Sequence, residues 1–185
     1  LFTVLYIYLT FDTQKYQKWA YKITSLCILT YIYKMLQPHE FYMQKALSEA
    51  KRALSEDEVP VGSIIVYNNK IIAKSFNMCV KLCDPTAHAE MQVITAASNY
   101  LNSRYLEKCI MYTTLEPCHM CSGALYWAKI GQIVYGASDK KNGFSLMKEH
   151  LIHPKTIVIK GVLENECSYL LTDFFKKKRK FKSKK

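Results

Sequence analysis

The first regular pattern along the chain is helical. Between residues 38 and about 56, apolar side chains recur every three or four positions, opposite charged ones, which predicts an amphipathic helix. The apolar set is Met43, Ala46, Leu47, Ala50 and Leu54. After a break around Pro60, two apolar stretches at 63–67 and 70–76 flank Asn68 and Asn69. This asparagine pair favours a tight turn, so the sequence predicts an antiparallel hairpin.

Helical and extended patterns then alternate. Residues 87–101 are apolar almost all round a predicted helix, which indicates burial in a layered fold. Further helices are predicted over 118–129 and from about residue 165, and short strands over 109–113, 132–135 and 156–159. Strands that alternate with helices indicate an α/β sandwich.

The N-terminal residues differ in composition from the rest. Residues 1–34 contain nine of the 24 aromatic residues and no Gly, Pro or Met. Their two apolar runs are shorter than the roughly 18 residues of a spanning helix, and the basic region and cleavage pattern of a signal peptide are missing. The first methionine is Met35. We therefore expect residues 1–36 to be an extension outside the domain, not part of the functional protein; a membrane-associating extension is the alternative.

Charge is concentrated at the other end of the chain. The net charge is +11, and eight cations lie within residues 176–185, which leaves +3 for the remainder. We expect one folded domain over 37–175 followed by a disordered basic tail over 176–185 that binds polyanions. A solubilising tail and a nuclear address are the alternatives.

Seven cysteines, an odd number, without a signal peptide favour a reducing compartment, and we expect a cytoplasmic protein with no membrane contact.

Two motifs place metal-binding side chains at predicted helix starts. In the first, Thr86 is the expected N-cap, which leaves His88 and Glu90 in the opening turn. In the second, Cys118 and Cys121 share one face of a first turn, where the helix dipole favours thiolate over thiol. One imidazole and two thiolates are three zinc ligands, and a catalytic zinc site keeps its fourth position open. Glu90 then remains available to move protons.

Each motif alone has another interpretation. An H-x-E pair is usually a solvated helix face, and a single C-x-x-C is also found in redox sites and in half of a structural zinc site. A redox pair leaves the H-x-E unexplained, and a four-cysteine zinc site needs a second C-x-x-C. The two motifs together form the H-x-E…P-C-x-x-C signature of zinc nucleobase deaminases.

With their flanking residues, the motifs resemble those of the tRNA-specific adenosine deaminases of the cytidine deaminase superfamily, over residues 37 to about 180. The matching segments are 58–62 (EVPVG), Asn77, 84–90 (DPTAHAE), 114–118 (TLEPC), 135–137 (YGA) and 173–175 (DFF). The resemblance implies a three-layer α/β/α sandwich with a five-stranded mixed sheet, a homodimer and one zinc ion per subunit. It also implies inosine formation at the first anticodon position, with the tRNA anticodon stem-loop as partner. Residues 1–34 match nothing in the family.

The resemblance also assigns roles to individual residues. His88, Cys118 and Cys121 are the implied zinc ligands, and Glu90 is the implied proton shuttle. The implied base pocket consists of Val61, Asn77, Leu115 and the backbone of Ala89. Asp139, Lys141 and Phe174 are the implied contacts to flanking nucleotides.

Val61, Leu115 and Phe174 also have an ordinary interpretation as core residues at such spacing. Two other functions stay open at this point: a deaminase of a free base or nucleoside such as guanine or cytosine, and a zinc-stabilised RNA-binding module without catalysis. Glu90 argues against the last, because a structural site has no use for an unliganded carboxylate.

Overall fold

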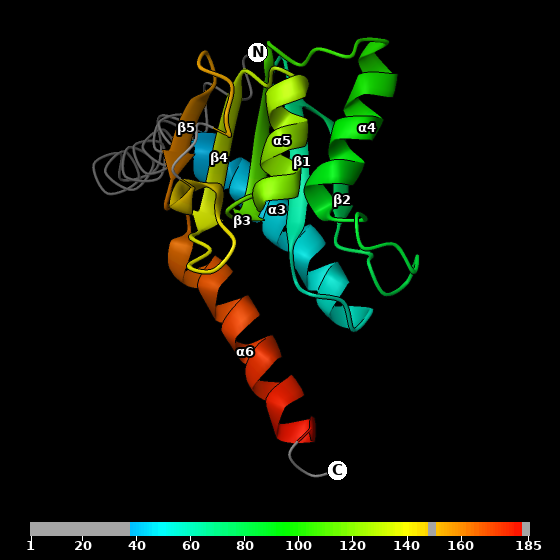
Figure 1. Ribbon diagram of the computed structural model, residues 1–185, viewed down its shortest axis with the longest axis vertical. Coiled ribbons are helices and arrows are strands. Elements are labelled where there is room, and N and C mark those ends of the chain that lie inside the picture. The colour runs from blue at the N-terminus through cyan, green and yellow to red at the C-terminus, as the bar shows by residue number, and fades with distance from the viewer. Residues whose placement is uncertain (1–37, 148–150, 183–185) are drawn as a thin grey trace, which may run out of the picture. The chain divides into compact units, whose positions relative to one another are not determined.

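The structure is a computed structural model that describes residues 38–147 and 151–182 of the chain (Figure 1). The expected extension over residues 1–36 and the domain start at residue 37 lie outside the described residues. In chain order the elements are α3 (Pro38–Ser55), β1 (Gly62–Tyr67), β2 (Lys70–Phe76), α4 (Ala89–Leu101), β3 (Cys109–Leu115), α5 (His119–Trp127), β4 (Gln132–Ala137), the 3-10 helix η1 (Phe144–Leu146), β5 (Ile157–Lys160) and α6 (Glu164–Lys182).

The five strands form one mixed sheet in the order β2-β1-β3-β4-β5. β1 pairs with β2 and with β3 in antiparallel fashion, whereas β3 with β4 and β4 with β5 are parallel pairs. The predicted hairpin is confirmed: Tyr67 pairs with Lys70, and Asn68 and Asn69 both have positive φ, 46° and 59°. Positive φ at both central residues is the geometry of the turn that hairpins favour.

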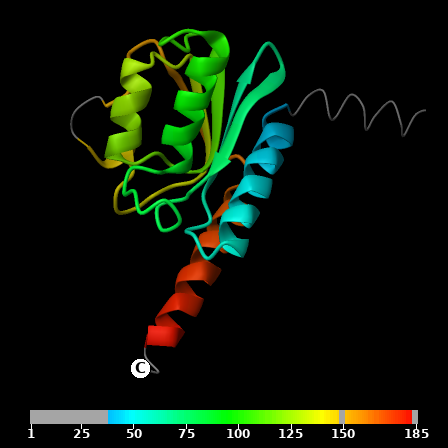
Figure 2. The ribbon, with the colours of Figure 1, turned by 90° about the vertical axis from the view of Figure 1, so that its right-hand side faces the viewer.

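Helices cover both faces of the sheet (Figure 2). On one face, Val93 and Ala97 of α4 and Leu125 of α5 pack with Ile65 and Met111 of the sheet. On the other face, a second core joins α3, α6 and the sheet through Met43, Ala46, Ile64, Tyr112 and Cys167. Ile64 and Ile65 are neighbours in β1 but belong to different cores, as alternating side chains of a strand must. The predicted three-layer α/β/α sandwich is confirmed.

Several strands are longer than the sequence pattern predicts. β3 continues to Leu115 and β4 to Ala137, two residues further than expected in each case, because Leu115 pairs with Ala137 in the parallel ladder. This extension brings the end of β3 to the segment that precedes α5. The start of β1 lies at the same edge of the sheet, because β1 runs antiparallel to β3.

The expectation of a disordered tail over 176–185 is wrong for most of its length, since α6 continues to Lys182. Lysine and arginine are good helix formers, and cations near a helix C-terminus interact favourably with its dipole. Two ion pairs also hold these turns: Lys177 with Asp173 at 2.7 Å and Lys178 with Asp57 at 2.5 Å. Within the described part of the chain, no helix has the length and apolar character needed to cross a membrane.

Candidate metal centre and active site

The start of α4 presents His88 and Glu90 to the edge of the sheet. The N-cap is His88 rather than the predicted Thr86, and the His88 ring makes no capping hydrogen bond. Thr86 instead forms a local turn with Asp84. The backbone N–H and the hydroxyl of Thr86 both donate to Asp84 Oδ1, each at 2.7 Å. This local turn is typical of aspartate. The His88 imidazole is therefore available as a metal ligand, and Glu90 lies in the first turn.

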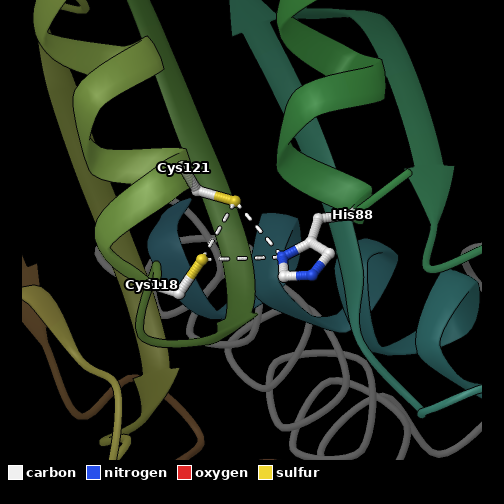
Figure 3. A group of neighbouring side chains, drawn as sticks. All are labelled: His88, Cys118 and Cys121. Carbon is white, nitrogen blue, oxygen red and sulfur yellow. Dashed lines mark hydrogen bonds between the residues drawn. The ribbon is translucent and has the colours of Figure 1, made fainter. Parts of the chain in front are cut away.

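The start of α5 presents the two cysteines. Cys118 is the N-cap, and its side chain makes no capping hydrogen bond. Cys121 lies within the first turn and is fully buried. The hydroxyl of Ser122 donates to the carbonyl of Cys118 at 2.7 Å, which ties the N-cap residue to the helix. Both sulfur atoms point toward the His88 ring (Figure 3).

The three donor atoms have the separations that a zinc ion requires. His88 Nδ1 lies 3.6 Å from Cys118 Sγ and 3.4 Å from Cys121 Sγ, and the two sulfurs are 3.7 Å apart. With ordinary Zn–S and Zn–N bond lengths, tetrahedral geometry places two sulfurs about 3.8 Å apart and a sulfur about 3.6 Å from a nitrogen. The residues fit zinc in donor chemistry and in spacing, and they form a candidate zinc site.

The electrostatics of this group favour a thiolate at Cys118, whereas the hydrogen bond with Cys118 and then burial raise the pKa of Cys121. The hydrogen bond with Cys121, and then that with His88, lower the pKa of Cys118 to about 4, although burial acts in the opposite direction. The hydrogen bond with Cys118 in turn raises the pKa of His88. A bound cation favours the thiolate form of both cysteines.

Glu90 is a buried carboxyl beside the three ligands, 4% exposed. Burial is the main effect on this group and raises the pKa of Glu90 to about 7. The nearby His88 and Cys121 act in the opposite direction, and the neighbouring Cys118 adds to the rise. A carboxyl with a pKa near neutrality is suited to accept and return a proton.

The donor group opens into a cavity of about 1040 Å³. Eight of the residues singled out from the sequence line it: Val61, Asn77, His88, Glu90, Leu115, Cys118, Asp139 and Lys141. The walls come from the β1 and β3 ends, the segment after β2, the loop after β4 and one side of α6. The structure thus brings residues separated by about 80 positions to one site.

The structure does not bring Phe174 to this cavity. Phe174 is 6% exposed and buried, whereas the next residue, Phe175, is 44% exposed and lines the cavity together with Arg179. Neighbouring residues of a helix point about 100° apart, so the packing of α6 decides which of the two phenylalanines faces the site. The helical spacing of Thr172, Phe175 and Arg179 is the signal in the sequence that marks this side of α6.

The loop after β4 is held by a second buried carboxylate. Glu116 is 2% exposed, and its two oxygens accept hydrogen bonds from the backbone N–H of Asp139 at 3.0 Å and of Ser145 at 2.9 Å. A Cβ on Gly143 would lie 2.5 Å from the Glu116 carboxyl. Glu116 therefore fixes the loop that carries Asp139 and Lys141 along the cavity.

Known proteins share both the motif and the fold. Residues 36–137 match the model of the cytidine and deoxycytidylate deaminase zinc-binding region. The tRNA-specific adenosine deaminase of Aquifex aeolicus (strain VF5) is 46% identical in an alignment of 145 positions that covers 76% of this chain and 95% of the relative. The chain belongs to the tRNA-specific adenosine deaminase family. The family and the zinc-binding motif inferred from the sequence are thereby confirmed.

Two solved structures are similar to this protein in both sequence and fold. One, from a study of A-to-I editing by tRNA:A34 deaminases at the wobble position, superposes with a TM-score of 0.67 at 38% identity and covers 71% of this chain and 99% of that one. A guanine deaminase from Bacillus subtilis superposes with a TM-score of 0.52 at 38% identity, over 54% of this chain and 64% of its own. Both support the cytidine deaminase-like fold.

Proposed function

We propose that this protein is a zinc-dependent hydrolase that converts adenosine to inosine at the wobble position of tRNA, the first position of the anticodon. The observation that carries the proposal is the unliganded carboxyl of Glu90, buried beside three zinc ligands at the bottom of a cavity. A structural metal site has no need of such a group, whereas hydrolytic deamination requires a proton shuttle.

In the proposed reaction, His88, Cys118 and Cys121 hold the metal. Zinc, when bound, acidifies a water molecule and so supplies a hydroxide nucleophile near neutral pH. Glu90 accepts the proton that the water gives up. As hydroxide adds to C6 of adenine, Glu90 passes this proton to N1. Glu90 then takes the proton of the new C6 hydroxyl and delivers it to the amine, so that the C6–N bond breaks as the C6 carbonyl forms. Ammonia leaves, and the carbonyl of inosine remains at C6.

The base pocket follows from the cavity wall. Val61 and Leu115 supply apolar contacts to the base, and Asn77 supplies a polar one; all three line the cavity. Ala89, at the start of α4, is fully buried and does not line the cavity, so its backbone contact to the base stays a prediction. A concave apolar pocket with a few polar groups is the usual form of a small-molecule site.

The outer cavity suits a nucleic acid strand. Asp139 and Lys141 line it on one side and Phe175 and Arg179 on the other. We propose that these four residues contact flanking nucleotides, with Phe175 in the role expected for Phe174. Aromatic rings stack with unpaired bases and arginine pairs with phosphate. An anticodon loop fits because its bases are already unpaired.

The assembly and its location are part of the same proposal. We expect a homodimer, in keeping with the family resemblance, and the exposed Tyr126 and Trp127 of α5 offer an apolar surface for it. We place the reaction in the cytoplasm, where a reducing environment suits the six described cysteines, all free.

A deaminase of a free base is the second candidate, because the Bacillus subtilis guanine deaminase is as similar in sequence over the shared half of the chain as the tRNA:A34 deaminase. The deciding experiment incubates the zinc-loaded protein with unmodified tRNA and, separately, with free adenosine, cytidine and guanine. We expect inosine in tRNA alone, and none from Glu90→Gln, which should still bind one zinc per chain. Product from a free base but not from tRNA would replace the proposal with the second candidate.

A further inference from the structure

Besides Glu90 and Glu116, another buried carboxylate borders the cavity and has no part in the proposed chemistry. Glu58 precedes β1, is fully buried and lines the cavity. Within residues 38–147 and 151–182, no cation forms an ion pair with it. Its oxygens instead accept two hydrogen bonds: Oε2 from Asn77 Nδ2 at 3.0 Å, and Oε1 from the backbone N–H of Lys81 at 2.7 Å.

These contacts leave Asn77 little freedom. The backbone N–H of Asn77 donates to the carbonyl of Val61 at 3.0 Å, which fixes the residue at the start of β1. The side chain is then held by Glu58 through the amide nitrogen. The amide oxygen of Asn77, Oδ1, accepts a hydrogen bond from the Cys79 thiol, with the sulfur 3.4 Å away.

The chemistry of the two groups makes this orientation unambiguous. A carboxylate only accepts hydrogen bonds, whereas an amide presents an acceptor oxygen and a donor NH₂. The NH₂ of Asn77 must therefore face Glu58, because the flipped amide would set its oxygen against a carboxylate oxygen. A glutamine at position 58 would remove that constraint, since it donates as well as accepts.

We infer that Glu58 is a positioning residue for base recognition, which holds the Asn77 amide in place at the wall of the cavity that receives the base. Through Lys81, the same carboxylate also holds the segment between β2 and α4 at the cavity rim. This inference rests on the proposed function and on Asn77 as the polar contact to the base. The inference assigns a role in base recognition to the segment 58–62. The hydrophobic residues of this segment alone do not explain why it carries a buried carboxylate.

The test is a double-mutant cycle on zinc-loaded full-length protein with Glu58→Gln, Asn77→Ala and the double variant, measuring kcat/KM for tRNA, zinc content and Tm. Glu58→Gln should lower kcat/KM by about 10–100-fold, as displacement of a contact group does, while zinc content is unchanged. In the Asn77→Ala background the same change should lower kcat/KM by less than about twofold, because the group that Glu58 positions is gone.

Glu49→Gln is the matched control. Glu49 is also buried, at 4% exposed, but it pairs with Arg52 of its own helix at 2.6 Å and does not line the cavity. We expect Glu49→Gln to lower Tm without changing kcat/KM. If Glu58→Gln does not yield zinc-loaded protein, Glu58→Asp, which is too short to reach both partners, replaces it in the same cycle.

Unchanged kcat/KM in the Glu58 variant, or a loss that is equally large with and without Asn77, would overturn the inference. A wild-type protein that deaminates no substrate in the panel above would remove the proposed function and this inference with it. An active wild-type protein with an unaffected Glu58 variant would remove only the inference.

Discussion

His88, Cys118 and Cys121 converge because two helices start at one edge of the sheet. His88 and Cys118 are both N-cap residues whose side chains make no capping bond, so each is left for another partner. Cys121, three positions after Cys118, lies on the same face of the first turn. Zinc coordination is then the interaction that satisfies all three side chains, and metal binding should contribute directly to folding stability.

Cys118→Ser should bind zinc poorly as well as fail to deaminate, because it removes a thiolate from the metal. We expect zinc affinity to fall by more than the roughly 10–100-fold that loss of an outer hydrogen-bond partner causes. Zinc stoichiometry by elemental analysis and a competition titration with a chelator check this. Cys83→Ser, at an exposed free cysteine, is the control and should bind zinc normally; normal binding by Cys118→Ser would mean that the ligand set is wrong.

At the scale of elements, α3 packs directly on the start of β1. Gly62 has no room for a side chain there: a Cβ would lie 2.2 Å from the carbonyl oxygen of Ala46 and 2.4 Å from the backbone nitrogen of Ala50. Both neighbours are backbone atoms of a helix, which cannot move independently. Because Val61 and Glu58 lie just before this contact, the packing of α3 also sets the position of the pocket wall.

Gly62→Ala should lower the free energy of unfolding by about 1–3 kcal/mol through overpacking. Gly123→Ala is its control, because a Cβ at Gly123 meets nothing within 4 Å and alanine in a helix interior is more stable than glycine by about 0.5–1 kcal/mol. Urea denaturation of both zinc-saturated variants measures the difference. Equal stability of the two variants would contradict the close packing of α3 against β1.

α6 is the other element whose position has a functional consequence. Its cations are spread around a helix: Lys177 and Lys178 form ion pairs with carboxylates, whereas Arg179 lines the cavity. The basic turns therefore do not act as one flexible polycation. The side of α6 that carries Phe175 and Arg179 lines the cavity, and it is the side that we propose contacts RNA.

Arg179→Ala should weaken tRNA binding most at low salt. If Arg179 neutralises one phosphate, the slope of log K against log salt should become less steep by about 0.7–0.9. kcat at saturating tRNA should change little, because Arg179 does not contact the metal ligands. Lys108→Ala removes an exposed cation just before β3, at the opposite end of that strand from the site, and is the control. Parallel lines for wild type and Arg179→Ala would contradict the phosphate contact.

At the scale of the whole molecule, the described residues from His39 onward belong to one compact unit. Both hydrophobic cores lie within this unit, as do the zinc ligands and the residues of the cavity. The fold and the site therefore draw on the same part of the chain.

A chain that begins at Met35 should fold and deaminate tRNA as well as the full chain. All contacts described for the two cores and the cavity are retained in it. Tm, zinc content and kcat/KM of the two proteins should agree within error. Aggregation of the shorter protein, or loss of its zinc, would show that the N-terminal residues are required for the fold.

The sequence alone was enough to predict the candidate zinc ligands, the neighbouring Glu90 and the order of helices and strands, because short-range spacing and hydrophobic periodicity carry that information. Tertiary structure alone decided that Phe175 rather than Phe174 faces the cavity, since the rotation of α6 is set by packing against the sheet. It also decided that the basic residues before Lys182 are helical. The pairing of Glu58 with Asn77 depends on the contact between the start of β1 and the end of β2, which brings together two residues that no local pattern connects.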